Sequence, residues 1–192
     1  MSTITTYILA AGSSRRFGNQ DKLLADLGGQ SVLLRSVGQA LAAQLGPVVV
    51  VGAPAMITAR LPLAVRVLEV GEGPLGNRLA AADRDARQGA CMVHLADMPL
   101  VPTKCFARVF QQGTACSQPT RAGSASQPGF PAYFPAGFLG GIANLDQLDG
   151  LRASVDPASW QYVALPDPAL GIDIDTPEDL ARARKFLLGK GS

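Results

Sequence analysis

Histidine and cysteine are scarce in this chain, and their scarcity excludes several kinds of catalytic site. The 192 residues include one histidine, His94, and three cysteines, Cys91, Cys105 and Cys116. No C-x-x-C pair occurs, and no group of Cys and His has zinc-ligand spacing, so we expect neither a zinc site nor a disulfide framework. His94 lies in an apolar segment, which indicates a core residue rather than the base of a Ser-His-Asp triad. We expect the thiols to be reduced and packed as small apolar side chains.

Clusters of like charge and unbroken apolar runs are also absent. The chain carries 17 Lys and Arg against 15 Asp and Glu, and its basic residues are scattered, unlike those of a nucleic-acid-binding surface. No charged residue occurs between Arg35 and Arg60, but glutamine, glycine and proline interrupt this stretch, so it does not predict a transmembrane span. Met1–Thr3 lacks the basic region of a signal peptide. We therefore expect a cytoplasmic protein that binds neither nucleic acid nor membrane.

The sequence does contain apolar segments that alternate with helical ones. Hydrophobic residues make up 47% of the chain, enough for a substantial core, and no linker divides residues 1–192 into two domains. The segments typical of buried strands are 5–10, 48–51, 65–70 and 90–95, and those with helical spacing are 31–45, 75–88 and 102–112. This alternation predicts a single-domain α/β protein with a Rossmann-like, doubly wound and mostly parallel sheet.

The last third of the chain has a different composition. Residues 117–129 are rich in Ser, Gln, Gly and Pro, which indicates a mobile loop beside a cleft or a variable connector. Beyond it we expect strands over 129–134, 160–165 and 172–175, and a helix over 137–148. Thr-Pro-Glu-Asp at 176–179 is typical of a helix start, so we expect a final helix from there to about Leu188.

The stretch after the first expected strand is the most informative. Residues 7–18 are Tyr-Ile-Leu-Ala-Ala-Gly-Ser-Ser-Arg-Arg-Phe-Gly, and Lys22 follows. Small residues let backbone N–H groups approach a ligand closely, and the three basic side chains favour a highly charged anion, which together indicate a triphosphate-binding loop. The loop is neither a P-loop nor a dinucleotide fingerprint, because Phe17 and Ser14 stand where these motifs require glycine. The alternative is an ordinary strand-to-helix turn with solvated arginines.

Acidic residues that follow expected strands complete a candidate site. Asp97 comes after the strand over 90–95, whose carboxyl end lies on the same sheet edge as the basic loop. A carboxylate beside bound phosphates is a typical Mg²⁺ ligand, although Asp97 could instead cap its own turn. Asp173 and Asp175 alternate along the chain and so point to opposite faces of a strand. Asp175, nearer the carboxyl end, is the predicted second ligand; alternatively, both acids serve only the helix start.

Three motifs resemble the signature of the MobA-like nucleotidyltransferases. They are Leu-Ala-Ala-Gly-x-Ser-x-Arg-Phe-Gly at 9–18 with Lys22, Leu-Ala-Asp-Met-Pro at 95–99, and Asp-Ile-Asp-Thr-Pro-Glu-Asp-Leu at 173–180. The resemblance spans nearly the whole chain and implies the nucleotide-diphospho-sugar transferase fold. The Ala-Ala-Gly form and the Asp-x-Asp-Thr-Pro-Glu-Asp ending look closer to the molybdopterin cytidylyltransferase branch than to the guanylyltransferase branch.

The resemblance also implies a role for each matched position. The backbone of the first motif would hold the base and ribose, its basic side chains would neutralise the triphosphate, and a later Gly-Pro turn would contact the base. The implied nucleotide-binding residues are Leu9, Ala10, Ala11, Gly12, Arg16, Lys22, Gly73, Pro74 and Asp97. The implied catalytic residues are Arg16, Lys22 and Asp97; the metal ligands are Asp97 and Asp175; and the residues near the acceptor are Gly129, Phe130 and Pro131.

Two departures from the cytidylyltransferase branch lie in the acceptor half. Phe130 stands where that branch commonly has histidine or asparagine, and residues 148–152 keep only fragments of its Gly-Asp-x-Gly-Ala-Arg segment. The resemblance therefore supports the nucleotide half better than the identity of the acceptor.

The implied activity is Mg²⁺-dependent transfer of a nucleoside monophosphate from an NTP to a phosphorylated acceptor, with release of pyrophosphate. CTP is the favoured donor, with GTP next, and molybdopterin is the expected acceptor. A phosphate nucleophile is already anionic and requires no general base, in agreement with the lack of a convincing one. A sugar or polyol phosphate as acceptor, and a non-catalytic nucleotide-binding module, are the alternatives. A molybdoenzyme or a chaperone is the protein partner that the resemblance suggests.

Overall fold

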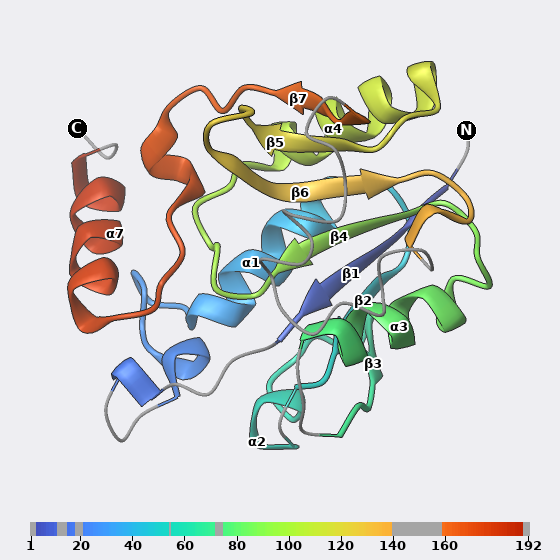
Figure 1. The fold of residues 1–192 in the computed structure, drawn as a ribbon. Coiled ribbons are helices and arrows are strands. Elements are labelled where there is room, and N and C mark those ends of the chain that lie inside the picture. The colour runs from blue at the N-terminus through green and yellow to red at the C-terminus, as the bar shows by residue number, and fades with distance from the viewer. Residues whose placement is uncertain are drawn as a thin grey trace.

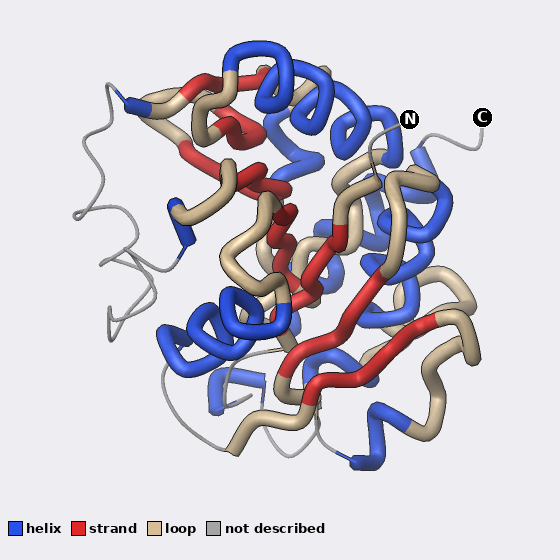
Figure 2. The backbone as a smooth tube through the Cα atoms, turned by 90° about the vertical axis from the view of Figure 1, so that its right-hand side faces the viewer, coloured by secondary structure: helices blue, strands red, loops and turns tan. Residues whose placement is uncertain are grey.

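The computed structural model of the chain describes residues 3–10, 15–17, 21–53, 55–71, 75–139 and 159–189. Within these ranges the strands form one sheet in the order β3-β2-β1-β4-β6-β5-β7, with helices on both sides (Figures 1 and 2). The strands are β1 Thr5–Leu9, β2 Val48–Val51, β3 Val65–Leu68, β4 Cys91–Leu95, β5 Thr120–Gly123, β6 Pro128–Phe134 and β7 Gln161–Val163. This mostly parallel α/β sheet confirms the predicted fold class.

The helices are α1 Val32–Ala42, α2 Ala55–Thr58, α3 Leu75–Asp85, α4 Thr103–Cys116 and α7 Pro177–Gly189, with 3₁₀ turns η1 Arg15–Phe17, η2 Lys22–Leu24 and η4 Pro168–Gly171. Helices α1, α3 and α4 begin close to the predicted positions but end elsewhere, whereas α7 ends within one residue of the predicted Leu188. The Ser31 side chain caps α1 by accepting a hydrogen bond from the Leu34 N–H, 3.3 Å away. Such side-chain caps are visible in the sequence, whereas helix ends depend on packing. No helix in the described ranges is both long and apolar enough to cross a lipid bilayer.

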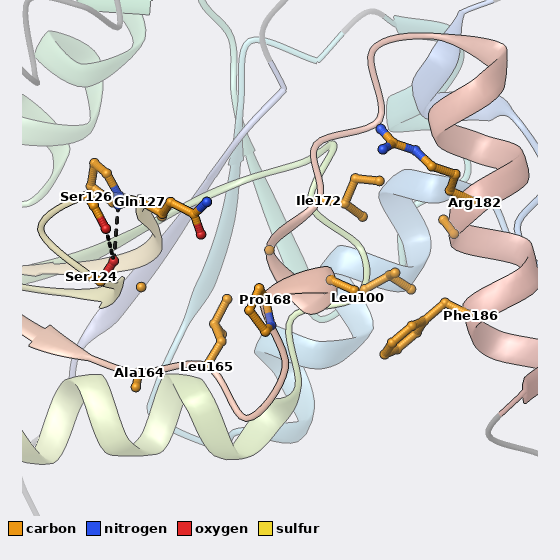
Figure 3. Close-up of a pocket in the computed structure, with 16 residues that line it drawn as sticks. Leu100, Ser124, Ser126, Gln127, Ala164, Leu165, Pro168, Ile172, Arg182 and Phe186 are labelled. Atoms are coloured by element: carbon orange, nitrogen blue, oxygen red, sulfur yellow. Dashed lines mark hydrogen bonds between the residues drawn. The ribbon is translucent and has the colours of Figure 1, made fainter.

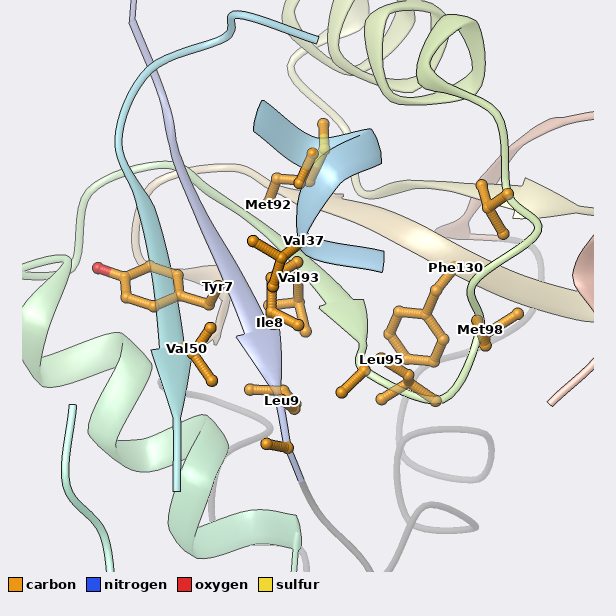
Figure 4. Packing of buried hydrophobic residues seen from close by; sticks show 14 of the residues in the cluster. Tyr7, Ile8, Leu9, Val37, Val50, Met92, Val93, Leu95, Met98 and Phe130 are labelled. Atoms are coloured by element: carbon orange, nitrogen blue, oxygen red, sulfur yellow. The ribbon is translucent and has the colours of Figure 1, made fainter. Parts of the chain in front are cut away.

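The parallel half of the sheet consists of β3, β2, β1 and β4. All four valines of β2 are buried, and Ile8 of β1 lies between Val50 of β2 and His94 of β4 in the register. Helices α1 and α3 both contact β1 and β2. Strands covered on both faces have unbroken apolar runs, and for this reason β2 was predictable from sequence, whereas β3 at the edge of the sheet carries the exposed Arg66. Figure 4 shows Tyr7, Ile8 and Leu9 of β1 packed beside Val50 and Val93.

The other half of the sheet contains one strand that runs in the opposite direction. Strand β6 is antiparallel to β4 and to β5, and β7 is parallel to β5. The carboxyl ends of β1, β4, β5 and β7 and the amino end of β6 therefore lie along one edge of the sheet. This edge carries the loops after β1 and β4, so the topology brings the basic loop and Asp97 together as predicted.

Two expectations for the last third of the chain were wrong. Residues 117–129 are not one loop: they contain the inner strand β5, whose buried Arg121 has its guanidinium 5.4 Å from the Phe130 ring and 4.9 Å from the Trp160 ring, while the turn after β5 does line a cavity. Residues 172–175 do not form a strand: Ile174 instead donates its N–H to the Asp97 carbonyl oxygen, at 2.9 Å. Most of the helix expected over 137–148 lies outside the described residues.

The sole histidine is a core residue, as predicted. His94 is fully buried, its ring lies 4.9 Å from that of Phe106, and its Nε2 lies 3.2 Å from the Met98 carbonyl oxygen. Burial lowers the pKa of His94 to about 4, partly opposed by this hydrogen bond, so the ring is neutral at pH 7. Cys91 and Cys105 are buried, but Cys116 at the end of α4 is exposed, which corrects the expectation for that thiol.

Candidate active site

The Lys22 ammonium lies at the centre of the candidate site. Its Nζ is 2.5 Å from Asp97 Oδ2 and 2.7 Å from Asp175 Oδ1. The Asp21 carboxylate caps the short η2 turn by accepting from the Leu23 N–H, which orients the backbone at Lys22. The Lys22 side chain is only 6% exposed. Three segments far apart in the sequence thus meet at one buried cation.

The Asp97 carboxylate is held at the carboxyl end of β4. The Ser36 hydroxyl donates a hydrogen bond to the Ala96 carbonyl oxygen at 2.8 Å, and the Ile174 N–H donates one to the Asp97 carbonyl oxygen. These two hydrogen bonds anchor the backbone before and after the Asp97 side chain. The Asp97 side chain is 14% exposed. Its Oδ1 is buried and accepts no hydrogen bond within the described part of the chain. A buried carboxylate oxygen without a donor is costly, which indicates that a ligand completes this position.

Asp175, rather than Asp173, faces Lys22. Its Oδ2 also accepts a hydrogen bond from Arg16 Nη2 at 2.8 Å, and its side chain is 34% exposed. The Asp179 carboxylate accepts from the N–H groups of Asp175 and Thr176, while the Asp179 N–H donates to the Thr176 hydroxyl. This reciprocal cap fixes the residue before α7 and thereby the position of the Asp175 carboxylate.

The electrostatic environment keeps opposite charges close together. Burial alone would lower the pKa of Lys22, but the charge of Asp97 and the hydrogen bonds to Asp175 and Asp97 outweigh it and raise that pKa. Burial raises the pKa of Asp97, with the Lys22 charge opposing it. Lys22 therefore stays protonated. The ionised form of Asp97 is favoured by the cation beside it, because burial alone favours the protonated form.

The two carboxylates match the donor set of a magnesium site. Mg²⁺ is usually held by one or two carboxylates, with phosphate oxygens and water completing an octahedron. Asp97 and Asp175 share one ammonium, and Asp97 Oδ1 accepts no hydrogen bond within the described residues. Within the described residues, no group of three or more His, Cys, Asp or Glu has metal-binding geometry.

Only part of the predicted nucleotide-binding backbone lies within the described residues. Leu9 and Ala10 are buried, the Leu9 carbonyl oxygen accepts from the Ala96 N–H, and the Ala10 N–H donates to the Val51 carbonyl oxygen. Arg16 is largely exposed, which leaves it accessible to a ligand at the sheet edge. Ala11, Gly12, Gly73 and Pro74 lie outside the described residues.

Comparison with known proteins gives the family. The family model described as "MobA-like NTP transferase domain" matches residues 6–163. The chain belongs to this family. It is 30% identical to a molybdenum cofactor guanylyltransferase of Cereibacter sphaeroides, an alignment that covers 94% of this chain and 95% of that protein.

Solved structures show the same fold as this MobA-like chain. The Rv0371c protein of Mycobacterium tuberculosis matches with a TM-score of 0.76 and 26% identity, over 96% of this chain and 98% of that one. A second structure of that protein is a complex with manganese. Molybdopterin-guanine dinucleotide biosynthesis protein A from Archaeoglobus fulgidus matches with a TM-score of 0.74 and 20% identity, over 97% of this chain and 100% of that one.

The structure describes all three residues that were predicted to lie near the acceptor. Phe130 is 4% exposed and packs in the core against Arg121. Pro131 is buried and follows a cis peptide bond. Gly129 accepts a hydrogen bond from Arg121 Nε at 3.0 Å and also lines a cavity. Of the three predicted acceptor residues, only Gly129 borders open space.

Sequence reasoning missed the residues that form that cavity. Gln127 lies on the turn between β5 and β6, and Arg182 and Phe186 lie on α7. Their signal in the sequence is weak, because the turn resembles an ordinary polar loop and α7 an ordinary amphipathic helix. Only the tertiary structure of the MobA-like domain places them opposite one another.

Proposed function

We propose that this MobA-like protein transfers GMP from GTP to molybdopterin, with Mg²⁺ as cofactor and pyrophosphate as the second product. The observation that carries the proposal is the meeting of Lys22, Asp97 and Asp175 from three separate segments at one sheet edge. The full-length relative at 30% identity is named a guanylyltransferase, which supports GTP as the donor. The manganese complex of Rv0371c supports a divalent cation in this fold.

The chemistry requires charge stabilisation more than proton transfer. An oxygen of the acceptor phosphate attacks the α-phosphorus of the NTP, the new P–O bond forms, and the bond to pyrophosphate breaks. Arg16 and Lys22 are placed to bind phosphate oxygens, and positioning with electrostatic stabilisation supplies most of the rate. Mg²⁺ held by Asp97 and Asp175 would add Lewis-acid stabilisation of the phosphates.

CTP is the second candidate donor. The Ala10-Ala11-Gly12 segment and the Asp-x-Asp-Thr-Pro-Glu-Asp ending at 173–179 resemble the cytidylyltransferase branch. The two donors present different hydrogen-bonding edges to the backbone of the first motif. A direct comparison of nucleotides therefore decides between them.

The test measures thermal stability with GTP, CTP, ATP and UTP, each with and without Mg²⁺. A ligand at a hundred times its Kd stabilises the fold by about 2.7 kcal/mol, so the true donor gives the largest rise in Tm. We expect GTP with Mg²⁺ to give it. A larger shift with CTP would reassign the donor while leaving the reaction class intact.

Substitution of Asp97 tests the reaction itself. Asp97→Asn removes the charge but keeps the shape, and we expect kcat for pyrophosphate release with molybdopterin to fall at least about a hundredfold. Glu178→Gln is the matched control, because this carboxylate is exposed in the first turn of α7, close to Asp175 in the chain. Full activity in Asp97→Asn, or no pyrophosphate release with any of the four NTPs, would overturn the proposal.

A further inference from the structure

The turn after β4, which carries Asp97, is held by three consecutive carbonyl oxygens. Those of Ala96, Asp97 and Met98 each accept a hydrogen bond, and each donor comes from a different part of the fold. The donors are the Ser36 hydroxyl of α1 at 2.8 Å, the Ile174 N–H before α7 at 2.9 Å and the His94 Nε2 of β4 at 3.2 Å. The backbone is therefore fixed before, at and after the Asp97 side chain.

Two of these hydrogen bonds join the turn to distant segments. Ser36 precedes Ala96 by 60 residues and reaches it from the middle of α1. Ile174 lies just before α7, and the chain beyond the turn stays beside this segment, because Leu100 and Ile172 line the same cavity of about 710 Å³ (Figure 3). Two other segments of the chain thus hold the turn, and the histidine holds it from its own strand.

His94 is the polar residue of a fully buried strand. Strand β4 reads Cys-Met-Val-His-Leu, and all five residues are buried. A carbonyl oxygen can only accept a hydrogen bond, so the neutral ring carries its proton on Nε2 and donates it to Met98. The Phe106 ring lies edge-on to the imidazole, 4.9 Å away, and restrains its orientation. The other ring nitrogen, Nδ1, is buried and forms no hydrogen bond with any residue that the structure describes.

The stability of the core does not explain these two polar side chains. A buried nitrogen without a hydrogen-bond partner is costly, and an apolar side chain of similar size can replace such a group at little cost. What His94 adds is the hydrogen bond to the Met98 carbonyl oxygen. The fully buried Ser36 hydroxyl lies 2.8 Å from the Ala96 carbonyl oxygen and 3.3 Å from that of Val32 in its own helix. Both side chains therefore serve the turn.

We propose that Ser36 and His94 are positioning residues that fix the Asp97 carboxylate for the divalent cation of the metal–NTP complex. They act through the carbonyl groups of the turn rather than through a contact with the metal. Alteration of a residue that orients a metal ligand typically changes metal affinity or activity by about 10- to 100-fold. The inference rests on the proposed function, because it takes Asp97 to be a metal ligand. It gives the sole histidine a role outside acid–base chemistry.

Hydrogen exchange of the free protein tests the restraint on the turn without metal or nucleotide. We expect the amides of residues 96–98 to exchange at least about fivefold faster in His94→Leu and in Ser36→Ala, the effect of losing one hydrogen bond of ordinary strength. His94→Gln keeps an N–H donor, so its exchange should stay close to that of the unaltered protein. The matched controls, which should show no change, are Met92→Leu, on the same buried strand, and Thr114→Ala, whose hydroxyl bonds within α4.

Calorimetric titration tests the effect on the metal site. The titrant is the NTP that gives the largest rise in Tm, once with Mg²⁺ and once with EDTA. In His94→Leu and Ser36→Ala we expect the affinity for the Mg²⁺ complex to fall at least about tenfold, the affinity for the metal-free NTP to stay unchanged, and Tm to stay within about 4 °C of that of the unaltered protein. His94→Gln should restore most of the Mg²⁺-dependent affinity. A residue that served only the core would lower Tm and weaken both affinities together.

The outcomes separate this inference from the proposed function. Unchanged exchange at residues 96–98, unchanged affinity for the Mg²⁺ complex, or an equal loss of affinity with Mg²⁺ and with EDTA overturns the inference and leaves the proposed function standing. If His94→Leu does not fold, Ser36→Ala decides alone. Absence of NTP binding to the unaltered protein overturns the proposed function, and with it the part of the inference that concerns the metal, whatever the exchange rates are.

Discussion

At the scale of single residues, the charge balance of the site depends on Lys22. Its ammonium is the partner of both Asp97 and Asp175, and two carboxylates this close repel each other without it. Lys22 and Asp97 are largely buried, where water screens charges poorly. Under the proposed function, the same ammonium that neutralises two acids in the free protein would bind the phosphates of the nucleotide.

Removal of Lys22 should make the fold depend on a divalent cation. Loss of one partner from a buried ion pair typically costs about 3 kcal/mol or more, so Lys22→Met should lower the free energy of unfolding by that order. Urea unfolding with and without Mg²⁺ measures this, and Mg²⁺ should restore part of the loss. Lys185→Met is the control because Lys185 is exposed. A Lys22→Met protein as stable as the unaltered one, at any Mg²⁺ concentration, would contradict the prediction.

His94 should contribute a defined pH dependence to stability. Burial lowers its pKa to about 4 in the fold, against about 6.5 in the unfolded chain. Between these values the unfolded chain binds a proton that the folded chain does not, so stability falls as pH decreases, by about 3 kcal/mol in total. In His94→Gln, whose amide can still donate to the Met98 carbonyl oxygen, this component should disappear between pH 7 and 4. If the unfolding free energies of His94→Gln and of the unaltered protein changed with pH in parallel, the prediction would be wrong.

At the scale of elements, helix α7 contributes residues both to the site around Lys22 and to the cavity, which lie at the same edge of the sheet. Its start holds Asp175 beside Lys22 through the Thr176–Asp179 cap, and its middle supplies Arg182 and Phe186 to the cavity. The Arg184 guanidinium donates to the Asp26 carbonyl oxygen at 2.7 Å, which fixes the helix to the loop after η2. A shift of α7 would therefore move the Asp175 carboxylate and one wall of the cavity together.

Loss of the α7 cap should cost both stability and metal affinity. Thr176→Ala removes the hydroxyl that accepts from the Asp179 N–H, and such substitutions typically cost about 1 kcal/mol. Because the same cap orients Asp175, we also expect a weaker Mg²⁺-dependent rise in Tm with NTP. Urea unfolding and the nucleotide Tm assay measure the two effects. Glu178→Gln, in the same helical turn but exposed, should show neither effect.

At the scale of the whole molecule, one sheet connects the parallel strands β3, β2, β1 and β4 to the antiparallel β6 and its neighbours β5 and β7. The parallel strands carry the basic loop and Asp97, and the antiparallel β6 reverses the chain so that the β5–β6 turn reaches the same edge. Because β4 and β6 are paired in one sheet, binding at the edge should stabilise the sheet as a unit.

Thiol labelling should report this stabilisation. Burial raises the pKa of Cys91 to about 12 and that of Cys105 to about 11, whereas Cys116 is exposed. We expect one thiol per native chain to react rapidly with a thiol reagent and three after unfolding. An NTP with Mg²⁺ should slow the labelling of Cys91 and Cys105 and leave that of Cys116 unchanged. Equal labelling rates at all three cysteines in the native protein would contradict the burial.

The sequence by itself determined the parallel half of the sheet and the edge on which the site lies. Unbroken apolar strands such as Val48–Val51, and a cap such as Ser31, are local patterns. The ends of parallel strands meet along one edge whatever the side chains, so Lys22 and Asp97 could be placed together in advance.

Only the tertiary structure decided the acceptor half. The buried Arg121 of β5 lies against the ring of Trp160, which is distant in sequence, and no local periodicity encodes such a contact. The same holds for the cavity between Gln127 and Arg182. Local pattern sets which segments form strands and helices, whereas long-range packing and charge pairing set which side chains face the ligand.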